Sequence, residues 1–336
     1  MKVLRKILYP LVIIYFLITS VRNILYDLKL IKSKSFNFPV ICIGNLSVGG
    51  TGKTPMVEFL IRMLKNNYEL AILSRGYGRK SKGFIISNSN SSTNCLGDEP
   101  FQIKKKFPSL SVAVDSNRTR GIQILKDLRP LTQIIILDDA FQHRRINPGI
   151  SILLTVYNDL YSDDCLLPVG NLREPIIGSK RAQIIIVTKC PEDLSSSKKQ
   201  IIEKKLNLGQ NQKLFFSSIF YESKICSNQK TKPLSSLINK NFTLVTGIAN
   251  SKPLVNHLRA LNFKFQHLEF PDHHQFSRNE LNLISSEKII LTTEKDFSRL
   301  NLVEHESLFY IPIKTKIHLQ EKFENEIRIF LENFAF

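Results

Sequence analysis

The sequence lacks several features that mark particular classes of protein. Its 336 residues include no tryptophan and only five cysteines, which are scattered and form no C-x-x-C pair. A disulfide framework and a zinc ribbon are therefore disfavoured, and a reducing compartment is expected. Internal repeats and low-complexity tracts are also absent. Hydrophobic residues make up 43% of the chain, which excludes disordered and fibrous classes, and the length predicts two domains or one large α/β unit with an addition.

Acidic residues are few relative to basic ones. The 29 Asp and Glu against 47 Lys and Arg give a formal net charge of +18. A field of this sign favours nucleotides, nucleic acid, anionic lipid or phosphorylated substrates as partners. Charge alone does not choose among them, so the choice depends on motifs.

The apolar run near the start of the chain, residues 7–21, is short for a membrane span. As a helix it reaches about 22 Å, whereas the hydrocarbon core of a bilayer is about 30 Å thick. Basic residues flank the run, and no small-residue cleavage site follows it. We expect a membrane-attachment helix within residues 1–31 that lies in one leaflet, with its basic flanks on anionic headgroups. A core helix, a signal peptide and a true span are the alternatives.

Short β-branched runs alternate with longer amphipathic stretches after residue 33, which predicts βαβ units and a parallel sheet. The predicted strands are residues 39–43, 69–73, 83–87, 111–114, 133–137, 151–156 and 183–188, then 242–247, 263–269, 288–293 and 308–313. The predicted helices include residues 55–65, 192–212 and 253–261, and a last one from residue 320.

A glycine-rich segment between a predicted strand and a predicted helix has the pattern of a P-loop. The backbone N–H groups of such a turn and the helix N-terminus cradle phosphates, while the lysine reaches the β and γ oxygens and the next residue the magnesium ion. Ser47 stands where the strict G-x-x-x-x-G-K-[ST] pattern has glycine, yet the three glycines that follow permit the positive φ such a turn needs. The expected nucleotide-binding residues are Ser47, Val48, Gly49, Gly50, Thr51, Gly52, Lys53 and Thr54.

Two carboxylates, Asp138 and Asp139, follow the apolar strand predicted at residues 133–137. A parallel strand carries such residues to the edge of the sheet where ligands bind, so we expect them to direct magnesium. Adjacent side chains on a strand point to opposite faces, so both act only if the chain turns after Leu137. A solvated turn is the alternative.

Five further motifs follow the P-loop along the chain. They are S-R-G-Y-G-R at 74–79, G-D-E-P at 97–100, D-D-A-F-Q-H-R at 138–144, L-R-E-P at 172–175 and D-H-H at 272–274. On spacing alone each is compatible with a turn. In this order the chain resembles the tetraacyldisaccharide 4′-kinase family of bacterial lipid A synthesis. The likeness covers most of the chain, and D-D-x-F-Q-H-R is unusual among P-loop proteins.

The resemblance implies a kinase at the cytoplasmic face of the inner membrane, attached peripherally or monotopically. It would use ATP and Mg²⁺ to phosphorylate the 4′-hydroxyl of an acylated glucosamine disaccharide 1-phosphate, giving lipid IVA. The expected partners are this substrate and an anionic membrane surface, without nucleic acid. We expect an α/β fold with a P-loop NTPase-like kinase domain at 32–217, a linker rich in Ser, Asn and Lys at 218–240, and a smaller C-terminal α/β domain at 241–336 that closes over the active site.

The resemblance also assigns roles to individual residues. Asp98 matches the family's proposed catalytic base and His273 its partner; since the two fall in different predicted domains, the site is expected to form where the domains face each other. Asp138, Asp139 and Glu174 match positions near the metal and the phosphates. The remaining matches are Glu99, His143 and Arg173 in the active site, and Arg75 and Arg118 as candidates for holding the 1-phosphate. Taken without the family, Asp98 is typical of a helix N-cap, and the two arginines of a solvated basic face.

A nucleic-acid-associated P-loop ATPase is the main alternative, because of the positive charge. It predicts aromatic residues interleaved with Lys and Arg along a groove. The most lipophilic aromatics, Tyr9, Tyr15 and Phe16, lie instead in the apolar N-terminal run, which favours a membrane. A non-enzymatic nucleotide switch also remains open.

Overall fold

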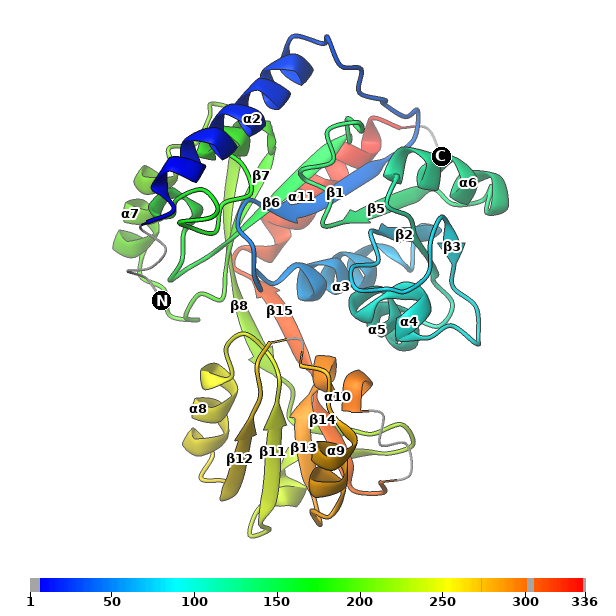
Figure 1. Ribbon diagram of the computed structural model, residues 1–336, viewed down its shortest axis with the longest axis vertical. Coiled ribbons are helices and arrows are strands. Elements are labelled where there is room, and N and C mark those ends of the chain that lie inside the picture. The colour runs from blue at the N-terminus through cyan, green and yellow to red at the C-terminus, as the bar shows by residue number, and fades with distance from the viewer. Residues whose placement is uncertain (1–6, 273, 301–304, 335–336) are drawn as a thin grey trace. The chain divides into compact units, whose positions relative to one another are not determined.

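The computed structural model describes residues 7–272, 274–300 and 305–334, and the chain divides into two compact units (Figure 1). Unit 1 comprises Met1–Ile219 and Thr315–Phe336, and unit 2 comprises Phe220–Lys314. The chain leaves unit 1 within β8 (Lys213–Tyr221) and returns to it within β15 (Ile313–Ile317).

Unit 1 is built on a nine-stranded sheet with the order β15-β8-β7-β6-β1-β5-β2-β4-β3. The strands from β8 to β4 pair in parallel, and β3 is antiparallel to β4. The bounds of the other strands are β1 (Val40–Asn45), β2 (Leu70–Ser74), β3 (Ile85–Ile86), β4 (Ser111–Val114), β5 (Ile134–Asp138), β6 (Ile150–Val156) and β7 (Ile184–Thr188). The predicted parallel sheet is confirmed, and β8 and β15 are additions that the sequence did not predict.

Helices cover both faces of this sheet because its strands are apolar on both sides. Ile41 and Ile43 of β1 join the core under α3, α5 and α11, whereas Val40 and Cys42 join the core under α6. The helices and 3₁₀ turns of unit 1 are α2 (Tyr9–Asp27), α3 (Lys53–Leu64), α4 (Thr93–Leu96), α5 (Asp98–Lys106), α6 (Arg118–Leu128), η1 (Tyr161–Asp163), η2 (Ile176–Arg181), α7 (Ser196–Leu206) and α11 (Gln320–Glu332).

Unit 2 contains a six-stranded sheet with the order β10-β9-β14-β13-β11-β12. Its middle strands pair in parallel, and β9 and β10 form an antiparallel edge. Its elements are β9 (Lys224–Cys226), β10 (Thr231–Pro233), η3 (Leu234–Leu237), β11 (Phe242–Thr246), α8 (Lys252–Ala260), β12 (Phe265–Glu269), α9 (Arg278–Ser285), β13 (Ile290–Thr293), α10 (Glu294–Leu300) and β14 (Leu308–Ile311).

The two units differ from the predicted domains at both ends of the second one. The segment expected to be a linker, residues 218–240, holds the end of β8, both strands of the antiparallel edge and η3. The last segment belongs to unit 1 because α11 buries Phe323, Ile327 and Leu331 in the core shared with α3. Amphipathic spacing predicts that α11 buries one face, but it does not say which sheet that face covers.

The N-terminal helix α2 has 19 residues, which corresponds to about 28 Å, and is long and apolar enough to cross a membrane by length and composition. Only Asn23 and Tyr26 of this helix are buried. Its exposed apolar side chains include Leu11, Ile13, Ile14, Phe16, Leu17, Ile18, Val21 and Ile24. Because the apolar face is uncovered, α2 is not a core helix of unit 1, and its length and composition are compatible with a span.

Candidate active site

The P-loop connects the buried strand β1 to α3, and two of its glycines adopt backbone angles that suit no other residue well. Gly49 has φ 112° and Gly52, the residue before α3, has φ 89°. Ser47 has no positive φ and forms an antiparallel bridge with Leu172, so the strict pattern's glycine is not required at this position. The start of the P-loop, at Ser47, is thus fixed by the L-R-E-P segment. The rest of the loop, from Gly49 to Gly52, forms a glycine-rich turn.

The lysine of the P-loop lies against the carboxyl end of β1 and the turn after β5. Its Nζ is 3.2 Å from the side-chain oxygen of Asn45 and 3.7 Å from Asp139. Arg173 donates to both oxygens of Asp139, at 2.9 and 3.3 Å, and to the Asn45 carbonyl at 2.8 Å. Burial alone would raise the pKa of Asp139, but Lys53 and Arg173 outweigh it and hold that pKa below its ordinary value. Asp139 is therefore an ionised carboxylate that orients two cations at the phosphate edge.

Asp138 is the last residue of β5 and is almost fully buried. Ser74 at the end of β2 donates to one of its oxygens at 3.2 Å, and the other oxygen is buried without a hydrogen-bond partner. Burial raises the pKa of Asp138 to about 7; the carboxylates of Asp139 and Glu99 add to this, and Lys53 opposes it. Asp139 has φ 47°, so the chain does turn directly after the strand. Both carboxylates consequently reach the same edge of the sheet.

The unpartnered oxygen of Asp138 is the observation that fits a cation. Among residues 7–272, 274–300 and 305–334, no three His, Cys, Asp or Glu side chains form a group that could hold a metal ion. Magnesium in phosphoryl-transfer enzymes is held by one or two protein ligands together with the substrate phosphates, so such a group is not required. Thr54, in the first turn of α3, and Asp138 are the residues that would hold Mg²⁺ with ATP.

The G-D-E-P motif begins α5, and Asp98 is the first residue of that helix. The residue before it, Gly97, has φ 88°, and a Cβ there would lie 2.7 Å from the Tyr77 carbonyl oxygen, so only glycine fits. Asp98 is half-buried, and the N-cap position falls to glycine rather than to Asp98. The next residue, Glu99, is close enough to Asp138 to raise its pKa. The motif therefore places Glu99 near Asp138, whereas the role expected for Asp98 stays a prediction.

The candidate substrate arginines differ in exposure. Arg75 follows β2 and is exposed, whereas Arg118 is 5% exposed and donates to the Asp139 carbonyl at 3.2 Å. Burial, then the nearby charge of Arg75, lowers the pKa of Arg118. Burial and the charges of Arg118, Arg145, Arg22 and Arg75 lower the pKa of His143 to about 4, so this histidine is neutral at pH 7. Arg118 is thus a buried cation, so the alternative of a solvated basic face does not apply to it.

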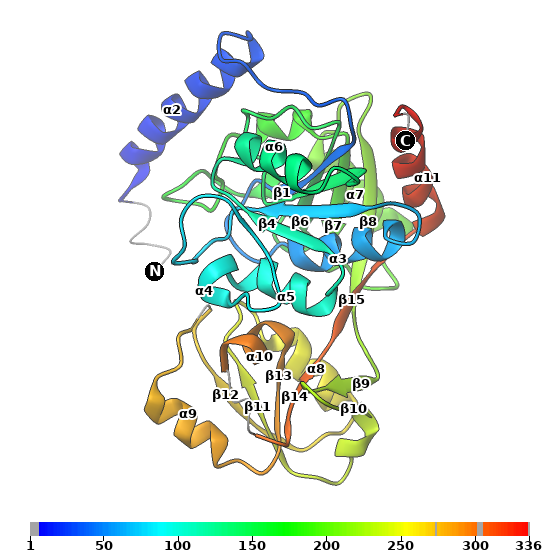
Figure 2. The same cartoon turned by 90° about the vertical axis from the view of Figure 1, so that its right-hand side faces the viewer.

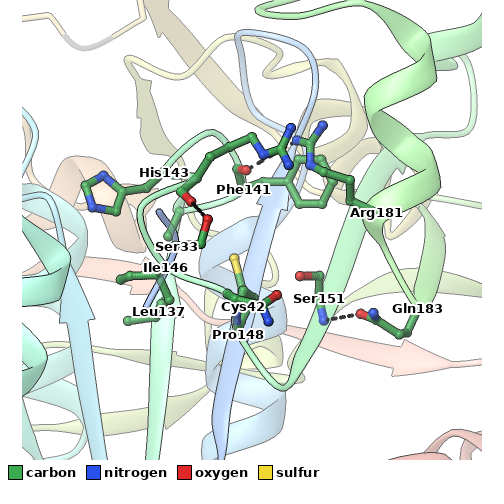
Figure 3. A pocket seen from close by; sticks show the side chains of 13 residues that line it. Ser33, Cys42, Leu137, Phe141, His143, Ile146, Pro148, Ser151, Arg181 and Gln183 are labelled. Carbon is green, nitrogen blue, oxygen red and sulfur yellow. Dashed lines mark hydrogen bonds between the residues drawn. The ribbon is translucent and has the colours of Figure 1, made fainter. Parts of the chain in front are cut away.

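A small cavity lies under the loop that follows Asp139, beside Cys42, Phe141 and His143 (Figure 3). Its volume is about 90 Å³, which is room for about three water molecules and too little for a nucleotide. Figure 3 shows Arg181 against the ring of Phe141, 4.5 Å from its centre. This cavity is therefore a packing feature beside the site and not the nucleotide pocket.

Glu174 was expected near the metal, but other side chains occupy its carboxylate. Glu174 is 1% exposed, and its carboxylate accepts hydrogen bonds from Asn23, Gln142 and Arg181. His273 lies outside the described residues. Its neighbour His274 is within 3.1 Å of Glu280 in unit 2.

Sequence reasoning missed three polar residues that organise this edge: Asn45, Ser74 and Gln142. Asn45 is fully buried at the end of β1 and Ser74 is buried at the end of β2. A buried polar residue that ends a strand on the phosphate side is the signal that could have identified them. Gln142 lies within the D-D-x-F-Q-H-R motif, in which Asp138, Asp139 and His143 were assigned roles.

The chain is similar to known proteins along almost its whole length. A family profile described as "Tetraacyldisaccharide-1-P 4′-kinase" matches residues 4–332. The tetraacyldisaccharide 4′-kinase of Flavobacterium johnsoniae is 49% identical, covering 97% of each chain, and that of Bacteroides thetaiotaomicron is 45% identical, covering 96% of this chain and 92% of the other. The crystal structure of LpxK from Aquifex aeolicus in complex with ATP has a TM-score of 0.80 and 31% identity, over 98% of this chain and 99% of that chain.

Proposed function

Because the chain belongs to the tetraacyldisaccharide 4′-kinase family, we propose that the edge formed by the P-loop and β5 transfers the γ-phosphoryl group of ATP to the 4′-hydroxyl of an acylated disaccharide 1-phosphate. Membership makes the chain an ATP-dependent kinase of lipid A synthesis, and the product is lipid IVA. The alternative of a nucleic-acid-associated ATPase is not favoured by the family match.

The proposal depends chiefly on one observation: Lys53 lies between Asn45 and Asp139, beside a buried carboxylate with a free acceptor oxygen. Phosphoryl transfer needs little covalent help from the protein, so positioning and charge carry most of the catalysis. In this arrangement Lys53 and the start of α3 hold the phosphates, while Asp139 and Arg173 hold Lys53 and each other in place. Magnesium, when bound with ATP, supplies charge that stabilises the transferring phosphoryl group.

We assign Asp98 as the base that accepts the proton of the acceptor hydroxyl. A carboxylate with an ordinary pKa of about 3.9 is a weak base, but the proton leaves late in a loose transition state, so its position matters more than its basicity. We propose that Asp98 accepts this proton and that His273 shares it. The pairing with His273 stays a prediction.

The experiment measures ATP-dependent phosphorylation of an acylated disaccharide 1-phosphate by the purified chain, with the product located by mass spectrometry. Asp98→Asn is expected to lower kcat by roughly 10² to 10⁴ with little change in ATP binding. His273→Ala should cost a similar factor, and the double variant should be little worse than either single one, since paired residues are not additive. Asp127→Asn, at an exposed end of α6, is the control. Wild-type turnover in Asp98→Asn would remove Asp98 from the mechanism.

We further propose attachment to the cytoplasmic face of the inner membrane through α2. The support is the uncovered apolar face of this helix together with the net charge of +18, which suits anionic lipid. Deleting residues 1–31 should move the protein into the soluble fraction and preserve ATP binding. A deletion variant that still sediments with membranes would contradict the proposal, and tight binding of single-stranded DNA would revive the nucleic-acid alternative.

A further inference from the structure

Glu174 is a buried carboxylate whose two oxygens are already occupied. The Gln142 side chain donates to one oxygen at 3.0 Å and the Asn23 side chain to the other at 3.1 Å. Arg181 lies 2.9 Å from the same carboxylate and stacks on Phe141. A metal ligand needs a free lone pair directed at the ion, whereas here three donors already occupy most of the roughly four acceptor sites of the carboxylate.

The hydrogen bonds continue from Glu174 to the P-loop lysine. The amide nitrogen of Gln142 also donates to the Asn45 carbonyl, at 2.8 Å. Asn45 in turn accepts a hydrogen bond from Lys53 through its side-chain oxygen, at 3.2 Å. Asn45 is fully buried; its carbonyl also accepts a hydrogen bond from Arg173 at 2.8 Å, and its side-chain amide donates to the Ser47 carbonyl at 2.6 Å. Gln142 and Arg173 therefore share the carbonyl of Asn45, the residue whose side chain contacts the ammonium group of Lys53.

The other end of the same network lies on α2. Asn23 is 7% exposed, on a helix that leaves most of its apolar side chains uncovered. The neighbouring Arg22 donates to the Gln142 carbonyl at 2.7 Å. Two adjacent residues of α2 thus contact this pair: Asn23 binds the side chain of Glu174, and Arg22 binds the backbone carbonyl of Gln142.

We infer that Asn23 and Glu174 are positioning residues for phosphoryl transfer, which link docking of α2 to the placement of Lys53. The inference rests on the proposed kinase reaction and replaces the metal-ligand role expected for Glu174. Loss of Asn23 leaves a buried carboxylate with one donor fewer, and the network rearranges around it. Small misplacement of a catalytic group lowers the rate much more than it lowers substrate binding.

The test compares Asn23→Ala, Glu174→Gln and the double variant in detergent micelles that hold the acylated disaccharide 1-phosphate. Asn23→Ala is expected to lower kcat about tenfold and Glu174→Gln roughly hundredfold, with the double variant no worse than Glu174→Gln. The Mg²⁺ concentration for half-maximal rate and the ATP dissociation constant should each stay within about twofold of wild type. Asp27→Asn is the control, because it removes the ion pair of α2 with Arg144 and touches neither Glu174 nor Gln142.

Two results would overturn the inference. One is a Glu174→Gln variant that needs about tenfold more Mg²⁺ while Asn23→Ala behaves like wild type, since this is what a metal ligand predicts. The other is an Asn23→Ala variant with the turnover of the Asp27→Asn control. Should Glu174→Gln fail to fold by circular dichroism, Asn23→Ala alone still decides. An inactive wild type would instead remove the proposed function.

Discussion

The two terminal helices of unit 1 are attached to the same sheet by opposite kinds of surface, and Figure 2 shows them on opposite sides of the unit. The helix α11 buries Phe323, Ile327 and Leu331 in the main core and exposes its polar side. The helix α2 buries Asn23 and Tyr26 and exposes its apolar side. Only Val12 and Tyr15 of α2 pack, partly buried, against an apolar cluster of the unit.

The two helices show two different uses of apolar residues: burial in the core of the unit and exposure on its surface. On α11 the apolar side chains stabilise the fold, at about 25 cal/mol for each Å² removed from water. On α2 comparable side chains stay exposed, while hydrogen bonds and an ion pair fix the helix to the unit. Hydrogen bonds of this kind contribute about 1 kcal/mol each. They therefore fix the orientation of α2 on the unit and add little to the free energy of unfolding.

The largest effect is expected from truncating the apolar contact of α11. Phe323→Ala should lower the free energy of unfolding by about 3 to 5 kcal/mol, because the ring is fully buried against Phe59 and Phe215. Urea unfolding measured by circular dichroism checks this, with the exposed Asn325→Ala as control on the same helix. If both variants unfold at the same urea concentration, α11 does not belong to the core.

The buried carboxylate of Asp138 should make the free energy of unfolding depend on pH, whereas the packing of Phe323 should not. Burial raises the pKa of Asp138 to about 7, against about 3.9 in an unfolded chain. The folded state therefore binds the extra proton, and this contribution to stability is present below about pH 4 and lost as the pH rises through 7. Without nucleotide and Mg²⁺, Asp138→Asn should equal wild type at pH 4 and exceed it at pH 8, by at most roughly 4 kcal/mol.

The same urea titrations supply the comparison between the two regions. Phe323→Ala should lower the unfolding free energy by a constant amount from pH 4 to pH 8, since it removes no titrating group. Parallel pH profiles for wild type and Asp138→Asn would show that Asp138 does not hold its proton in the folded state.

Polar substitutions on the outward face of α2 should weaken lipid binding without weakening the fold. Ile13→Ser, Leu17→Ser and Ile18→Ser together are expected to reduce binding to anionic vesicles roughly thirtyfold, because about 2 kcal/mol of apolar transfer is lost. The unfolding free energy should change by less than about 1 kcal/mol. Leu128→Ser with Leu131→Ser, two exposed apolar residues outside α2, is the matched control for sedimentation with vesicles. Equal loss in both variants would make the effect one of general hydrophobicity.

The smallest effect is expected from the exposed ion pair of α2. Asp27 is 61% exposed beside Arg144, and such pairs contribute about 0 to 1 kcal/mol. Asp27→Asn should leave vesicle binding unchanged and lower the thermal midpoint only slightly. A shift comparable to that of Phe323→Ala would mean that ionic attraction, and not the Asn23 network, fixes the helix.

The sequence predicted the strands that precede the P-loop and the two carboxylates because these signals are local. Continuous apolar runs predicted β1 and β5, and the residues directly after them were the expected P-loop and carboxylates. The strand β8 was missed since its aromatic and serine residues, next to a Ser- and Lys-rich stretch, resemble a boundary. The return of α11 to unit 1 depends on a partner sheet that helical periodicity does not identify.

Glu174 shows where local patterns and resemblance stop being sufficient. A motif names a carboxylate as functional but does not say which of its neighbours occupy its oxygens. Its partner Asn23 is 151 residues away in sequence and follows the apolar run, where no motif marks it as functional. Contacts of such long range are decided by the packing of whole elements, which composition and spacing do not contain.

Site-directed nitroxide labelling of α2 on anionic vesicles tests most directly whether its outward face contacts lipid while its inward face contacts unit 1. Labels replace Ile13 and Ile18 on the outward face, and Val12 and Thr19 on the inward face, after Ser replaces Cys95, Cys165 and Cys226. Burial raises the pKa of the Cys42 and Cys190 thiols to about 12 and about 11, so these two should stay unlabelled. High oxygen accessibility and low nickel-complex accessibility are expected at the outward pair alone. Greater lipid exposure of the inward pair would contradict this expectation.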